Sequence, residues 1–160
     1  MGIQSMLTIG ALMILSMTSL FFNKAILENS TVELENKVYL TAFSIADDML
    51  EEIKLKAFDE KTVQFPVSDP NSLTPAISLG RENTDPTGIY NDIDDYKGFT
   101  KLISAPHAED YYISCDVNYV SENALNTVSS SSTFYKKVSV TVSSPFMRLP
   151  VKLEFIFTLK

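Results

Sequence analysis

The chain of 160 residues has one cysteine, one histidine and no tryptophan. A single cysteine, Cys115, allows no disulfide within the chain, and a single histidine, His107, allows no metal site built from several histidines. Basic side chains are also in the minority, with 13 Lys and Arg against 20 Asp and Glu. Because nucleic-acid binding requires a concentrated basic face, we expect no nucleic-acid partner.

Sequence patterns that indicate catalysis are missing as well. There is no glycine-rich phosphate loop, no pair of cysteines and no arrangement of Ser, His and Asp that would suggest a catalytic triad. We therefore expect that the protein is not an enzyme and needs no cofactor. Cys115 stands in an alternating apolar segment, where a buried, unreactive thiol is the simplest expectation.

Charged side chains are absent from the first 23 residues, and the first one belongs to Lys24. About 20 apolar residues in a helix span the hydrocarbon core of a bilayer. No basic residue precedes this run and no small-residue cleavage motif follows it, so we expect a retained helix and not a cleaved signal peptide. The apolar side chains that would form its surface are Met6, Leu7, Ile9, Leu12, Met13, Ile14, Leu15, Leu20, Phe21 and Phe22.

Glycine and proline are absent between Gly10 and Pro66, so nothing interrupts the helix after its apolar part. The sequence predicts a helix from about Ile3 to about Ala57, roughly 80 Å long at the usual rise per residue. Its second part is amphipathic, with apolar residues three and four positions apart. We expect this stripe to pack on the rest of the chain; its members are Leu34, Val38, Ala42, Ile45, Met49 and Ile53.

Beyond residue 59 the apolar pattern changes to a period of two, which is typical of strands. Strands are predicted at residues 110–120, 135–143 and 151–159, and a short one at 62–67. Residues 75–98 are rich in Pro, Gly, Asn and Asp and predict a loop. The expected fold class is α+β, with the long N-terminal helix packed on a small C-terminal antiparallel sheet. The expected division is a helix over 1–58, apolar over 1–24 and amphipathic over 25–58, and a β domain over 59–160.

Three local motifs resemble those of type IV pilins and type II secretion pseudopilins. Residues 42–53, AFSIADDMLEEI, are similar to the end of the helix in minor pilin-like proteins and are followed by Phe58-Asp59, similar to their "Phe-Asp" exit. Residues 92–98, DIDDYKG, resemble their acidic loop, and residues 135–142, YKKVSVTV, resemble one of their strands. The likeness covers nearly the whole chain in order. It implies the same pilin-like fold as the apolar pattern does.

The N-terminus departs from the pattern of that family, in which a basic leader ends in Gly and the fifth mature residue is Glu. If Gly2 precedes the cleavage site, Ile3 is the first mature residue and Leu7 is the fifth. No acidic residue occurs before Glu28. The resemblance therefore leaves cleavage and methylation open, and implies that subunits find their register without a buried glutamate.

The resemblance implies a structural subunit of an extracellular filament at the cell surface. Its partner would be the chain itself, in a helical homopolymer formed by the pilus assembly machinery from a precursor inserted in the inner membrane. Two alternatives stay open. One is a minor pseudopilin of a secretion or pilus machine, and the other is a membrane-anchored extracytoplasmic binding domain.

The acidic loop suggests one ligand. Asp92, Asp94 and Asp95 offer carboxylate oxygens, which Ca²⁺ prefers. Their spacing is not that of an EF-hand, so a solvated turn without metal is the favoured interpretation, and calcium is the alternative.

Overall fold

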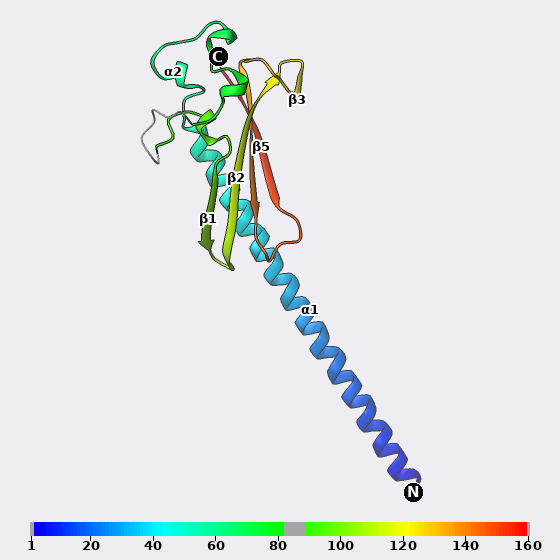
Figure 1. Cartoon of the computed structure of the whole chain (residues 1–160). Helices are drawn as coiled ribbons and strands as arrows, with labels where there is room; N and C mark the ends of the chain where they lie inside the picture. The colour runs from blue at the N-terminus through cyan, green and yellow to red at the C-terminus, as the bar shows by residue number, and fades with distance from the viewer. Residues whose placement is uncertain (1, 82–88, 160) are drawn as a thin grey trace. The chain divides into compact units, whose positions relative to one another are not determined.

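The computed structural model describes residues 2–81 and 89–159. Contacts divide the chain into two compact units, Met1–Lys37 and Val38–Lys160, which are described separately below. The long helix α1 covers Ile3–Lys54, so it ends about three residues before the predicted end. The α+β fold class predicted from the sequence is confirmed, with a long N-terminal helix and a C-terminal antiparallel sheet (Figure 1).

In the second unit an antiparallel sheet forms one layer. Its strands follow the order β1-β2-β4-β5, and a fifth strand, β3, pairs with the end of β2. Each predicted strand beyond residue 100 is present, and β4 has the predicted bounds. The strands are β1 (Thr100–Ala105), β2 (Ala108–Ser121), β3 (Ala124–Val128), β4 (Tyr135–Ser143) and β5 (Val151–Thr158).

The C-terminal part of α1 forms the second layer, and β2, β4 and β5 run alongside it (Figure 1). The core lies between the two layers. Alternation on the central strands places one face of each strand in this core, as predicted for Val138, Val140 and Val142 of β4. Cys115 on β2 is also buried, as its alternating segment predicts. The second compact unit therefore begins at Val38, inside α1. The boundary expected at residue 58 lies near the end of α1.

Several short helical segments connect α1 to the sheet. The strand predicted at residues 62–67 is wrong, because residues Glu60–Gln64 form the short helix α2. Asp59 explains the difference: its side chain accepts a hydrogen bond from the Lys61 amide, and Thr62 Oγ1 accepts one from the Asp59 amide, which together cap a helix start. The loop expected at 75–98 contains 3₁₀ turns, and its residues 82–88 lie outside the described part. The 3₁₀ turns within it are η2 (Ala76–Ser78) and η3 (Asp94–Tyr96), and another, η1 (Pro70–Ser72), precedes it.

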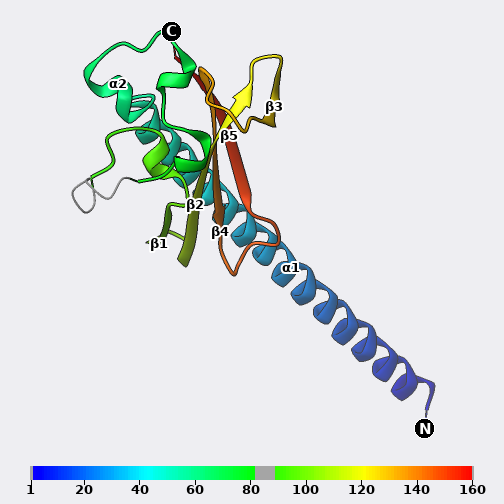
Figure 2. The same cartoon turned by 45° about the horizontal axis from the view of Figure 1, so that its top comes forward.

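The chain leaves α1 through a backbone pairing that brings two distant segments together. The Ala57 amide donates to Asn91 O at 3.2 Å, and the Ile93 amide donates to Ala57 O at 2.9 Å. Tyr96 of η3 adds a side-chain tie, because its hydroxyl donates to Glu52 Oε1 at 2.6 Å. Both views place α2 and the β2–β3 hairpin at the same end of the sheet (Figure 1 and Figure 2). The acidic segment after residue 91 is thereby fixed next to the exit from α1.

Candidate functional site

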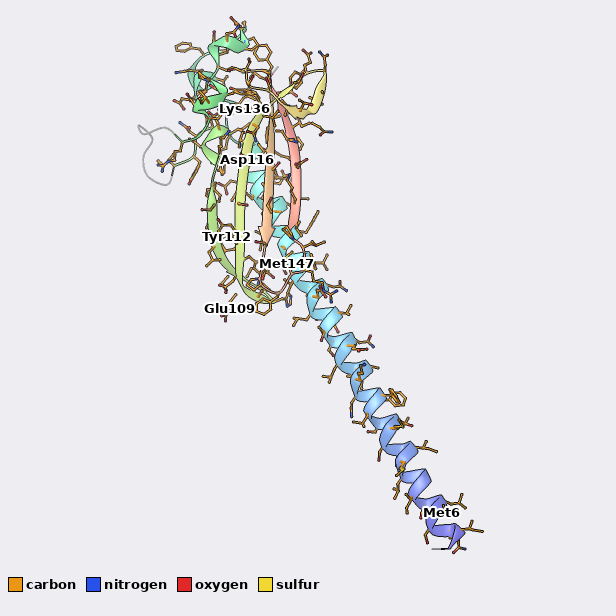
Figure 3. The ribbon with its side chains drawn as sticks, turned by 45° about the vertical axis from the view of Figure 1, so that its right-hand side comes forward. Met6, Glu109, Tyr112, Asp116, Lys136 and Met147 are labelled. Carbon is orange, nitrogen blue, oxygen red and sulfur yellow. The ribbon has the colours of Figure 1, made fainter. Side chains whose placement is uncertain are left out.

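The apolar part of α1 exposes its side chains all round. The ten residues predicted for this surface are between 44% and 69% exposed, and Ile14 and Leu20 are each at 69%. Met6 marks the start of this surface near the N-terminus (Figure 3). Soluble proteins rarely expose so large a continuous apolar surface to water. These residues therefore require lipid or other apolar side chains around them.

Hydroxyl groups in this segment do not make its surface polar. Thr8 Oγ1 donates to Ser5 O at 2.9 Å, Ser16 Oγ to Leu12 O at 2.8 Å, and Thr18 Oγ1 to Ile14 O at 2.8 Å. Each hydroxyl hydrogen is thus used by the helix's own backbone, an arrangement that apolar surroundings favour. Among the described residues, α1 is the one helix that is long and apolar enough to cross a membrane by length and composition.

Most of the amphipathic stripe lies in the core of the second unit. Val38, Ala42, Met49 and Ile53 are buried, and Ile45 is partly buried against the same cluster. The buried face also includes two residues that the sequence reading omitted, Ala46 and Leu50. Leu34 belongs to the first unit, and its side chain is 51% exposed.

A second feature is a buried polar centre at the end of the sheet that faces the connecting loops, where Figure 3 labels Lys136. Lys136 Nζ donates to Asp94 Oδ1 at 2.7 Å, Asp59 Oδ2 at 2.9 Å and Phe58 O at 2.7 Å. The side chains of the lysine and both aspartates are 0% exposed. Because three oxygens surround the ammonium, all its donors are used inside the protein.

Asp59 is held as a carboxylate by several donors. Thr74 Oγ1 donates to its Oδ1 at 3.0 Å, and the Tyr119 hydroxyl donates to its Oδ2 at 3.0 Å. Burial raises the pKa of Asp59, but the charge and hydrogen bond of Lys136, with the donors from Lys61 and Thr74, outweigh burial and lower it overall. Burial, together with the charge of Asp59, raises the pKa of Tyr119, so its hydroxyl keeps its proton.

Asp92 has the opposite character. Burial, followed by the charge of Asp94 and a hydrogen bond with its side chain, raises the pKa of Asp92 to about 9. Asp92 Oδ2 and Asp94 Oδ2 are buried and have no donor among the fixed hydrogens of the described residues. Asp92, with its raised pKa, keeps a proton that can be donated to a neighbouring oxygen. The centre therefore contains an ionised aspartate and a protonated one at neutral pH.

The calcium alternative for Asp92, Asp94 and Asp95 is not supported by this geometry. Asp94 is paired with Lys136, and Asp95 Oδ2 accepts the Asn91 amide at 2.8 Å. In the part of the chain that the structure describes, no group of three or more His, Cys, Asp or Glu side chains is arranged to hold a metal ion. The favoured solvated turn is also wrong, because all three aspartates are buried. One oxygen of each aspartate accepts a hydrogen bond within the protein.

Sequence reasoning missed the role of Lys136, although a signal was present. Lys136 lies two residues before Val138 on β4, so it faces the core like Val138, Val140 and Val142. A lysine in phase with buried valines needs an acidic partner in the interior. Two acidic motifs, around Asp59 and at residues 92–98, were available to supply that partner.

Comparisons with protein-family models, curated proteins and solved structures find no match to this chain. The class of the protein therefore rests on its architecture. A long N-terminal helix, apolar at its start and packed at its end on an antiparallel sheet, is a pilin-like fold.

Proposed function

We propose that the chain is a structural subunit of an extracellular, pilin-like helical filament. In this polymer the apolar part of α1 packs against the same segment of other copies, and the sheet domain faces outward. The proposed role is structural and not enzymatic. The observation that carries the proposal is the ring of exposed apolar side chains between residues 6 and 22, on a helix with no charged residue before Lys24.

Association through this surface can be strong. Once the segment has left the membrane, each large apolar side chain buried in the filament is favoured by about 1.5–3 kcal/mol relative to exposure to water. Contacts between different faces of identical helices generate helical fibres when the rotation from copy to copy does not close a ring, and the proposed filament requires this open case. Many copies can therefore associate along one axis through the surface around Ile14 without any charged pair to set their register.

A membrane-inserted state precedes the filament in this proposal. The length and composition of α1 meet the requirement for a membrane span, and the hydroxyls of Thr8, Ser16 and Thr18 donate to the helix backbone. The same observations favour the second candidate, a subunit that stays in the membrane as a minor pseudopilin or as the anchor of an extracytoplasmic binding domain. Assembly, and not membrane insertion, distinguishes the two candidates.

Ile14→Asp tests the proposal. A carboxylate in the middle of the apolar surface would be buried among helices without a partner, and we expect it to abolish filaments. The matched control is Ile77→Asp, which changes a side chain that is 96% exposed on the second unit. We expect filaments of normal abundance from this control.

The measurement is electron microscopy with mass spectrometry of fibres sheared from the producing cells, alongside the amount of chain in the membrane fraction. Membrane fractions separate failed insertion from failed assembly, because a variant that inserts but does not assemble stays at its normal level there. Filaments that persist in Ile14→Asp would refute the polymerisation role of α1. A wild-type chain found in membranes and not in sheared fibres would favour the second candidate.

A further inference from the structure

The polar centre around Lys136 places an amine against a carboxyl group in an interior without solvent. Lys136 Nζ is 2.7 Å from Asp94 Oδ1, and both side chains are 0% exposed. Aromatic rings cover the amine, with the Phe58 ring centroid 4.7 Å and the Tyr119 ring centroid 5.2 Å from Nζ. An amine and a carboxyl group held in this way have the geometry from which an amide can form.

The two aspartates next to the lysine are not equivalent as acceptors of such an attack. Asp59 receives hydrogen bonds from Thr74, Tyr119 and the Lys61 amide in addition to Lys136, which stabilise its negative charge. A carboxylate stabilised in this way is a poor electrophile and a suitable proton acceptor.

Asp94 is the better electrophile. Its Oδ1 accepts from Lys136, and its Oδ2 is buried and has no partner with a fixed hydrogen among the described residues. Asp92, whose pKa burial and the neighbouring Asp94 raise to about 9, lies close enough to serve as an acid toward Asp94. An acid beside Asp94 makes the carboxyl carbon of Asp94 easier to attack. The reason is that the Asp94 oxygen on which negative charge develops receives a proton from that acid.

We propose that Lys136 Nζ and Asp94 Cγ become joined by an isopeptide bond with the release of one water molecule. The Lys136 ammonium gives a proton to Asp59 Oδ2, and the resulting amine attacks Asp94 Cγ to form the new N–C bond. Asp92 gives its proton to an oxygen of Asp94, and the C–O bond to that oxygen breaks. Two protons are then available, the second ammonium hydrogen and the proton held by Asp59. One of them completes the water molecule, and the other restores the proton of Asp92.

Atoms and charge balance in this reaction, and no oxidant or other co-reactant is needed. One ammonium and one carboxylate become one neutral amide and one water. Groups that are held in contact react as if at effective concentrations of about 10⁵–10⁸ M, and the exclusion of solvent removes competing water. The amide keeps one N–H, which remains available to Asp59.

The bond would connect the first turn of η3 to the start of β4, across a sequence separation of 42 residues. Within the described residues, Lys136 Nζ already links these two segments through its hydrogen bond to Asp94 Oδ1. The proposal is independent of the filament role, because it concerns the interior of the sheet domain and not the apolar part of α1.

Intact-mass measurement of the full-length chain, purified in detergent and denatured before analysis, tests the proposal. We expect a mass lower by one water than the sequence mass. Proteolysis should yield one branched peptide in which Lys136 is joined to Asp94. Asp94→Ala and Lys136→Met should each restore the full mass of their sequences, and the matched control Lys137→Met, on the neighbouring position of β4, should still lack one water.

Asp94→Asn gives a second chemical signature, because its amide would lose ammonia, and not water, when Lys136 attacks. Succinimide formation at an aspartate also removes one water, but it produces no branched peptide and persists in Lys136→Met. A wild-type chain of full sequence mass would overturn the proposal and leave Lys136 as an ion-paired ammonium. A water loss that persists in Lys136→Met would overturn it as well.

Discussion

The buried carboxyl group of Asp92 is expected to make the sheet domain less stable as pH rises, and Asp92→Asn is expected to remove that dependence. Burial is the largest cause that raises the pKa of Asp92 to about 9, so the direction holds whether or not Asp94 carries a charge. In an unfolded chain the pKa of an aspartate is about 3.9. Between these two values the folded protein holds a proton that the unfolded chain releases.

The sign of the effect follows from this difference in bound protons. Because the pKa of Asp92 is raised by folding, its contribution is fully present below about pH 4 and is lost as pH rises toward about 9. The free energy of unfolding should fall by about 1.4 kcal/mol per pH unit, or about 4 kcal/mol between about pH 5 and about pH 8. Asp59 acts in a different range, because its lowered pKa gives stability that is lost only as pH falls below about 4.

Asparagine preserves the shape of the protonated acid and keeps an N–H donor toward Asp94, but it has no proton to lose. The variant should therefore unfold with nearly the same free energy at about pH 5 and about pH 8, and should exceed the wild type at the higher value. The assay is denaturant unfolding of the full chain in detergent, followed by the near-ultraviolet circular dichroism of its seven tyrosines.

Asp110→Asn is the matched control, because it removes an exposed aspartate of β2 and should keep the slope of the wild type. A wild-type domain whose stability is constant or increases across this pH range would refute the reasoning. So would an Asp92→Asn variant with an unchanged slope.

Two further substitutions test local interactions by the same unfolding assay. Tyr119→Phe removes the donor to Asp59 Oδ2 and should cost about 1.5–3 kcal/mol; an unchanged stability would contradict a role for this hydrogen bond. His107 has a φ of 74° in the turn between β1 and β2, a conformation that glycine adopts freely. His107→Val should therefore be less stable than His107→Gly by about 1–2 kcal/mol, and the reverse ranking would contradict the assigned turn.

The regular parts of the fold are predictable because their sequence patterns agree with their burial. The absence of Gly and Pro after Gly10 corresponds to one helix, Ile3–Lys54. Strict alternation corresponds to β4, where every second residue is buried. The edge strand β1 was missed because its burial pattern does not alternate regularly, and the strand β3 because all its residues are exposed. A period-two pattern detects strands that have one buried face and one exposed face, and neither β1 nor β3 has that contrast.

The candidate sites differ in how much the sequence reveals. The apolar surface of α1 is continuous in sequence, so its residues could be named in advance. The polar centre is assembled from Asp59, Asp94 and Lys136, which are separated by up to 77 residues. The three residues come together because the backbone of Ala57 pairs with the segment after residue 91. Apolar patterns with a period of two or 3.6 residues carry no information about that backbone pairing. The acidic residues are visible in the sequence, but without the lysine they predict a solvated turn, with calcium as the alternative.

The position of the polar centre explains why a lysine occupies a core position of β4. The connecting segments between α1 and β1 contribute buried apolar side chains to the core, and others from these segments are partly buried against it. The buried ones are Phe58, Leu73, Leu79, Ile93 and Tyr96.

An apolar residue at position 136 could fill the same volume, and such replacements of buried ion pairs are often neutral or stabilising. Before the proposed bond to Asp94 forms, however, the Lys136 ammonium is satisfied only when oxygens lie at hydrogen-bonding distance on several sides. Phe58, Asp59 and Asp94 supply those oxygens, so one side chain fixes the exit from α1 and η3 on the end of the sheet. We infer that the lysine provides a single arrangement of the loops more than it provides stability. In the proposed filament this would matter for assembly, because every copy must present the same surface to its neighbours.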